Sequence, residues 1–196
     1  NTINVTGTST LVPASATNLA VSEVMYHPGP PTDPELQAGF QDQDDFEFIE
    51  LVNLSETQTV DLTGLAFVNG IEYQFPDNAT LGPGSRALVT GREAAFLERY
   101  GAGFLILGSY QDGNSNKLAN DGERLVLNDA SGTPITDFSW DHNAPWPSSA
   151  DGLGFSLVLM VPGSNDPALP GSWRTSALSG GNPGASDAID LAGWQS

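Results

Sequence analysis

The chain has 196 residues and a formal net charge of -18, from 24 acidic and 6 basic side chains. A surface this acidic repels phosphate backbones, which argues against binding to DNA or RNA. No apolar run approaches the roughly 20 residues that a membrane span needs. The absence of cysteine excludes disulfides, thiol catalysis and thiolate metal sites.

Composition favours a fold made of many short elements. Hydrophobic residues make up 39% of the chain and charged residues 15%, a balance typical of a folded domain and not of a disordered acidic tail. The 22 glycines and 14 prolines are spread along the whole chain. Because these residues punctuate turns, their spread favours a β-sandwich or barrel over a helical bundle.

The chain begins with a linker-like segment, which two strong strand signals follow. Residues 1–18 are rich in Thr, Ser and Asn and are interpreted as a linker and the end of a preceding module, with one strand-like piece at Ile3–Thr6. A strand is predicted over Leu19–Pro28. Residues 29–45, rich in proline and then in acid, are predicted to form a long loop. The second strong strand is predicted over Phe46–Leu54, which is dense in β-forming residues.

Shorter strand signals, each bounded by Gly, Pro or Asn, follow in the rest of the chain. They lie at residues 60–64, 65–70, 71–76, 85–91, 122–129, 133–140 and 154–162. Asn69 and Gly70 tolerate positive φ and predict a tight hairpin turn. Gly91–Gly101 is the one good helix candidate, because its apolar residues form a stripe and its last glycine can end a helix. After Pro170 the chain is predicted to be mostly irregular, with Trp173 as its anchor.

These elements predict an all-β fold. About nine strands and one short helix are typical of an Ig-like two-sheet β-sandwich. We expect this domain to span residues 19–186. Residues 187–196 break the pattern and are interpreted as a linker to the next module.

Nine segments of the chain stand in a recognisable order. They are Val21–Pro28, Asp45–Asn53, Val60–Phe67, Tyr73–Pro76, Leu81–Gly91, 94–101, Leu118–Asp129, Ala144–Leu157 and Ser172–Asp187. This order resembles the lamin tail domain family, in the version found in large exported bacterial proteins. The resemblance implies an Ig-like sandwich that serves as an accessory domain beside catalytic, surface-anchoring or calcium-binding modules. It carries over no catalytic residue.

One acidic loop partly matches the calcium-binding loop of an EF-hand. Asp112, Asn114, Asn116 and Glu123 stand at offsets where oxygen ligands are needed for a hard cation. The sixth loop position, however, is Lys117, where the pattern requires glycine. The flanking segments also predict strands instead of helices. A simple turn that leads into a strand is therefore the favoured interpretation, with looser calcium contacts as the alternative.

A second carboxylate set consists of Glu23, Asp44, Asp45, Glu47 and Glu50. If the strands that hold Glu23 and Glu50 are neighbours, two carboxylates come together and must share a proton or bind a cation. Both glutamates alternate with apolar residues, so neither lies on a cleanly polar face. Glu23, Asp45 and Glu50 are thus calcium candidates, beside the favoured interpretation that the glutamates are exposed or bonded to the backbone.

Nothing in the sequence marks a hydrolase. The two histidines, His27 and His142, lie in predicted turns or loops, and there is no Gly-x-Ser-x-Gly elbow. Ser156 belongs to a predicted strand. The chain is therefore not expected to be an enzyme.

The sequence predicts a non-catalytic structural or interaction module of a larger exported protein, secreted or at the bacterial cell surface. It requires no cofactor, and its expected partners are the neighbouring domains of the same polypeptide, or a surface protein or glycan. The alternative is a calcium-stabilised carbohydrate- or protein-binding module, in which exposed aromatic residues such as Trp140, Trp146 or Tyr110 stack on sugar.

Overall fold

The computed structural model describes residues 9–111 and 115–187. In these residues the helices are α1 (Asp33–Gln37) and α2 (Glu93–Tyr100), with 3-10 turns η1 (Gln43–Phe46), η2 (Ser148–Ala150) and η3 (Pro170–Ser172). The strands are β1 (Thr10–Pro13), β2 (Leu19–Met25), β3 (Phe48–Asn53), β4 (Gln58–Asp61), β5 (Ala66–Asn69), β6 (Tyr73–Gln74), β7 (Thr80–Leu81), β8 (Arg86–Thr90), β9 (Ile106–Ser109), β10 (Arg124–Asn128), β11 (Pro134–Ser139), β12 (Leu157–Leu159) and β13 (Trp173–Thr175). Neither described α-helix is long and apolar enough to cross a bilayer.

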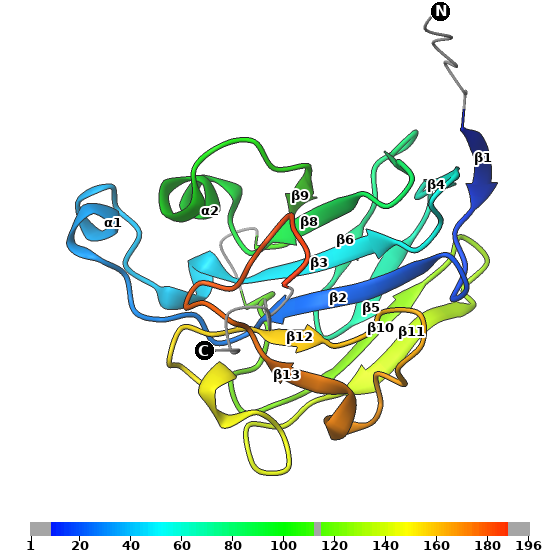
Figure 1. Ribbon diagram of the computed structural model, residues 1–196. Helices are drawn as coiled ribbons and strands as arrows, with labels where there is room; N and C mark the ends of the chain where they lie inside the picture. Colours follow the sequence, from blue (N-terminus) through cyan, green and yellow to red (C-terminus); the bar gives the residue numbers. More distant parts are fainter. Residues whose placement is uncertain (1–8, 112–114, 188–196) are drawn as a thin grey trace, which may run out of the picture.

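The largest sheet has six strands in the order β13-β12-β2-β3-β8-β9 (Figure 1). Its neighbouring strands are antiparallel except β8 and β9, which run parallel. A parallel pair needs a crossover connection, and helix α2 lies in the segment that joins these two strands. On β2, a register shift between Val21 and Glu23 inserts one extra residue, which is a β-bulge.

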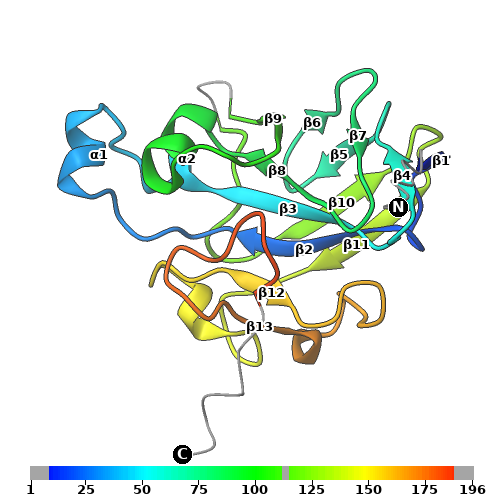
Figure 2. The same ribbon diagram turned by 45° about the horizontal axis from the view of Figure 1, so that its top comes forward.

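Two smaller sheets, β11-β10-β5-β6 and β1-β4-β7, form the second layer of the fold (Figures 1 and 2). Side chains alternate in direction along a strand, so each sheet turns one face towards the space between the layers. One core of buried side chains fills this space. It includes Leu19, Val21, Val24, Ile49, Leu51 and Val89 of the six-stranded sheet and Val60, Phe67, Leu81, Leu125, Leu127 and Phe138 of the smaller sheets. The predicted all-β sandwich is confirmed.

The other face of the six-stranded sheet, its outer face, carries a second apolar cluster. Met25, Phe48 and Leu88 contact Phe96 of helix α2 there. The rings of Phe48 and Phe96 meet edge to face at 5.8 Å, a favoured aromatic geometry. Helix α2, which the sequence predicts, thus covers part of the outer face.

The Pro-rich stretch before β3 differs from the predicted loop, because it contains helix α1 and turn η1. The N–H of Thr32 donates to Glu35 Oε2 at 2.6 Å, which caps the helix start. Glu35 also accepts a hydrogen bond from Arg99 of α2 at 2.8 Å, and the Arg99 guanidinium lies 3.5 Å from the ring centroid of Phe46. A five-residue helix is too short to show an apolar stripe, so periodicity could not predict it.

The folded region begins earlier and is more regular near its end than the sequence indicates. Strand β1 precedes the expected start at Leu19 and pairs in parallel with β4. After Pro170, strand β13 forms an edge of the six-stranded sheet, and the indole N–H of Trp173 donates to the carbonyl of Pro167 at 2.8 Å. The strand-like piece Ile3–Thr6 and residues 188–196 lie outside the described residues.

Candidate functional site

The outer face of the six-stranded sheet holds a pair of buried carboxylates. The register of β2 and β3 sets Glu23 directly opposite Glu50. Both side chains are buried. The bulge after Val21 explains why alternation failed to place Glu23: the extra residue shifts the strand's pattern by one, so Val21 faces the core while Glu23 faces outward.

Each carboxylate of the pair is bonded by donors of the same chain. Glu23 Oε1 accepts the hydroxyl of Ser156 at 2.5 Å and the N–H of Asn182 at 3.0 Å. Glu50 Oε1 accepts the hydroxyl of Ser22 at 2.7 Å and is ion-paired with Arg86. The second oxygen of Glu50 accepts the N–H of Gly184 at 2.6 Å.

Burial governs the protonation of this pair. It raises the pKa of Glu23 to about 7, because the charged form has lost its water, while the hydroxyl of Ser156 acts in the opposite direction. Burial also raises the pKa of Glu50, although the neighbouring Arg86 lowers it in part. The pair therefore tends to retain one proton near neutral pH, as closely placed carboxylates do.

Residues 176–187, here called the C-terminal strap, cover the pair. They run over β2 and β3 after leaving β13 (Figures 1 and 2). Asp187 fixes the end of the strap, because its carboxylate accepts from Arg174 at 2.6 Å and from the N–H of Ala177 at 3.0 Å. A space of only about 40 Å³ remains beside the carboxylates. The strap thus closes the pair to large ligands.

The remaining members of the predicted carboxylate set lie elsewhere, around the start of β3. Glu47 Oε2 accepts the hydroxyl of Tyr110 at 2.8 Å and the N–H of Leu118 at 3.0 Å. Asp44 forms an ion pair with Lys117, and Asp45 faces Arg92 at 3.4 Å. Burial raises the pKa of Glu47 well above its ordinary value. The structure therefore divides one predicted set into two separate groups.

The predicted calcium loop shows its polar groups used internally where it is described. Asn116 accepts the N–H of Glu72 at 2.9 Å and donates to the carbonyl of Tyr110 at 2.7 Å. Glu123 accepts the N–H of Ala119 at 2.5 Å. Asp112 and Asn114 lie outside the described residues. Residues 9–111 and 115–187 contain no group of three or more His, Cys, Asp or Glu placed to hold a metal ion.

The two histidines bond to different partners, and neither bonds to Ser156. His27 Nδ1 lies 2.7 Å from Asp151 Oδ1, whereas His142 Nδ1 donates to the carbonyl of Asp121 at 2.7 Å. Ser156 donates to Glu23, as described above. Each histidine therefore contacts a loop residue, Asp151 for His27 and Asp121 for His142.

The three aromatic residues suggested as a sugar platform are not exposed, so this prediction is wrong. Trp140 and Tyr110 are each 3% exposed and Trp146 is 9% exposed. All three belong to the main core. Large aromatic rings gain more free energy from packing in a core than from contact with water. The tertiary fold places each of these three rings in the core.

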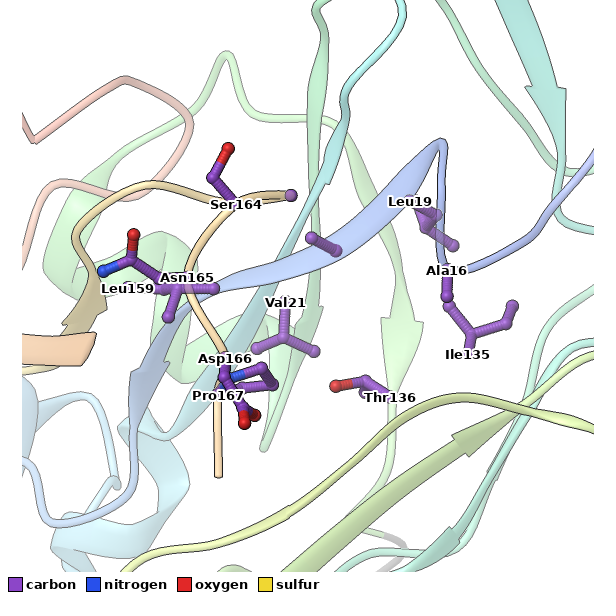
Figure 3. A pocket seen from close by; sticks show the side chains of 12 residues that line it. Ala16, Leu19, Val21, Ile135, Thr136, Leu159, Ser164, Asn165, Asp166 and Pro167 are labelled. Atoms are coloured by element: carbon purple, nitrogen blue, oxygen red, sulfur yellow. The ribbon is translucent and has the colours of Figure 1, made fainter. Parts of the chain in front are cut away.

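An open cavity of about 250 Å³ lies between the two layers, where β2 and β11 approach each other; we call it the β2–β11 slot. Figure 3 shows Val21, Thr136 and Pro167, from three different segments, converging on this space. Leu19 and Ile135, which belong to the core, also line it. No sequence signal pointed to the slot, because its walls come from segments far apart in the chain.

Arg86 and Arg174, which pair with the buried carboxylates of Glu50 and Asp187, were not predicted from the sequence. A signal did exist, since the chain has only 6 basic residues and these two stand within or beside strands. An arginine in a strand of so acidic a chain indicates a nearby acidic partner, which is buried for Arg86 and Arg174 and exposed for Arg124. No sequence feature predicts, in contrast, that backbone amides of the strap donate hydrogen bonds to the buried carboxylate pair.

These features define a class: an Ig-like β-sandwich domain whose buried ionisable side chains bond within the domain. The family model of the Lamin Tail Domain matches residues 13–142, more than half of the chain, and the chain belongs to the lamin tail domain family. No curated protein matches the chain. The family match ends at His142, whereas the six-stranded sheet takes two further strands, β12 and β13, from the residues that follow.

Proposed function

We propose that this lamin tail domain is a non-catalytic structural and interaction module of a larger exported protein. It holds neighbouring domains of the same polypeptide in position and offers a surface for contacts, secreted or at the cell surface. It requires no metal ion or cofactor for this role. Two observations support the proposal. The chain belongs to the lamin tail domain family, and its buried ionisable side chains bond to other groups of the same domain.

The observation that carries this proposal is the bonding of the Glu23–Glu50 pair. Catalytic or ligand-binding carboxylates keep at least one oxygen aimed at the space where the ligand lies. In this pair, Glu23 Oε1 and both oxygens of Glu50 are bonded by Ser156, Ser22, Arg86 and the strap amides, and the strap leaves a space of only about 40 Å³ beside them. The pair therefore acts as an internal fastener of the domain.

The alternative of a calcium-stabilised sugar-binding module has less support. The side chains of Asn116 and Glu123 bond to backbone groups of Tyr110 and Ala119, and the aromatic rings offered for sugar stacking are in the core. Protein binding is favoured by a specific observation, the β2–β11 slot.

The gene around this chain tests the proposal. We expect the coding sequence on both sides to encode an export signal and further domains, and we expect the full protein to be found outside the cytoplasm in cell fractionation. A gene that encodes this domain alone, with the protein in the cytosolic fraction, would contradict the proposal.

A further inference from the structure

The β2–β11 slot opens beside the start of β2, where the described part of the chain adds no neighbouring strand. Strand β12 is in register with Glu23 and Val24 of β2 and ends at Leu159. The chain then turns away into the loop 160–167, part of which forms one wall of the slot. On this side, no described strand pairs with the first three residues of β2, Leu19–Val21. The slot thus borders the edge of β2 that β12 leaves uncovered.

The backbone of this edge faces the slot. The carbonyl of Asn18 accepts the N–H of Leu54, so the residue before β2 points its backbone groups towards the β3 side. Hydrogen-bonding direction alternates along an antiparallel strand. Ala20 therefore also faces β3, and the backbone groups of Leu19 and Val21 point away from it, towards the slot. The N–H of Leu19 is already bonded to the carbonyl of Ser15 at 3.0 Å.

The walls of the slot define the chemistry of its occupant. Leu19, Val21 and Ile135 line the slot with side chains that are almost fully buried, while Thr136 and Asp166 add polar groups. Asp166 Oδ1 accepts the N–H of Ala168 at 2.9 Å, and the side chain is exposed. A strand edge is matched by another extended backbone. The net charge of -18 favours a partner with basic side chains.

We propose that the β2–β11 slot binds an extended peptide segment of another protein, which adds as a short strand beside Leu19–Val21. The segment places a β-branched side chain in the slot and a lysine or arginine next to Asp166. This inference rests on the proposed role as an interaction module and names the partner class for it.

A displayed library of random eight-residue peptides tests the proposal. Selection on the purified domain should enrich peptides that alternate β-branched and polar residues and carry a basic residue. The best peptide, made synthetically with a fluorescent label, should lose at least tenfold in affinity for the Thr136→Trp variant, because the indole fills the slot. Ser139→Trp, on the same strand but outside the slot, is the matched control and should bind as the wild type does.

Two further measurements test strand addition and the recognition of a basic residue separately. N-methylation of the peptide backbone should weaken binding at least tenfold if a strand is added, and unchanged binding would overturn strand addition. Asp166→Asn keeps the oxygen that bonds Ala168 and removes the charge, so it should weaken only peptides with a basic residue.

The library experiment can succeed or fail independently of the proposed function. No enrichment on the wild type over Thr136→Trp would overturn the slot as a docking site, even if the gene shows an exported protein with further domains. Conversely, enrichment with an isolated cytosolic gene product would keep the slot and remove the exported context.

Discussion

A buried glutamate is tolerated when it loses its charge or when donors satisfy its oxygens, and Glu23 combines a raised pKa with donors to one of its two oxygens. Its Oε1 accepts two hydrogen bonds, yet burial still raises its pKa to about 7. Because the folded state holds this proton more tightly than the unfolded state, Glu23 contributes stability below its unfolded pKa of 4.5. That contribution is lost as the pH rises through about 7.

We therefore expect Glu23→Gln to change the pH dependence of stability. Glutamine keeps the oxygen that accepts from Ser156 and Asn182 and carries no charge at any pH. Each pKa unit corresponds to about 1.4 kcal/mol. The variant should gain up to about 3 kcal/mol over the wild type at pH 8. The gain should shrink towards pH 5, and urea unfolding at several pH values measures it.

Glu98→Gln is the matched control for this experiment. Glu98 is exposed on helix α2, so its substitution should leave the pH profile of the wild type unchanged. A Glu23→Gln variant whose difference from the wild type is the same at pH 5 and pH 8 would contradict the protonation of the buried pair.

At the scale of elements, the C-terminal strap depends on glycine where it crosses the pair. Gly181 has φ +78°, and a Cβ there would lie 2.2 Å from Glu23 Oε1. Gly180 has φ +92°, but a Cβ there would meet only Tyr100, at 3.5 Å. The two positions share the backbone strain of a side chain at positive φ and differ in the collision.

Gly181→Ala should therefore loosen the strap more than Gly180→Ala does. Both variants bear a cost of about 1 kcal/mol for the left-handed backbone. Gly181→Ala adds an overlap that typically costs ~1–3 kcal/mol. Hydrogen exchange of the strap amides and chemical denaturation measure the difference. Equal effects of the two variants would show that the strap does not press on Glu23.

The bulge on β2 is the other element-scale feature that determines the candidate site. Without the extra residue, the side chain of Glu23 would share the face of Val21 and point into the apolar core. The sequence shows the alternation of apolar and polar residues along β2 but not the position of the bulge. A bulge forms through pairing with the neighbouring strand, which the local sequence does not reveal.

For the whole molecule, we expect calcium to leave stability unchanged. The buried carboxylates are bonded by the chain's own donors, and the described residues offer no cluster of three or more metal-binding side chains. A site filled at 100 times its dissociation constant would add about 2.7 kcal/mol, or several degrees in Tm. Thermal unfolding in calcium and in a chelator should give the same Tm, and a clear upward shift in calcium would refute this expectation.

The residues beyond the family match should be essential for folding. Strands β12 and β13 complete the six-stranded sheet, and Trp173 stacks on Phe138 with ring centroids 5.0 Å apart. Removing one buried tryptophan typically costs ~3–5 kcal/mol, against a total stability of about 5–15 kcal/mol for a domain.

A fragment of residues 10–142 should therefore fail to give cooperative unfolding, while residues 10–187 should unfold in one transition. Near-UV circular dichroism and thermal denaturation distinguish the two fragments. A cooperative transition for the shorter fragment would show that β12 and β13 are only an addition to an independent family core.

The sequence by itself determined the class of fold and the family of this protein. The signals that allowed this are local. They are glycine and proline at turns, the alternation of apolar and polar residues in strands, and the apolar stripe of the Gly91–Gly101 helix. Each acts through backbone angles or the direction of neighbouring side chains. Such signals do not depend on distant residues, so Phe46–Leu54 and the segments after it could be placed along the chain.

Only the tertiary structure decided what the polar and aromatic residues do. Glu23 meets Glu50 through strand register, the strap reaches them from more than 130 residues further along the chain, and Trp140 and Trp146 enter the core. The β2–β11 slot exists because β12 stops short of Leu19. These outcomes depend on which distant segments become neighbours, and burial and hydrogen bonding at such contacts cannot be deduced from local pattern.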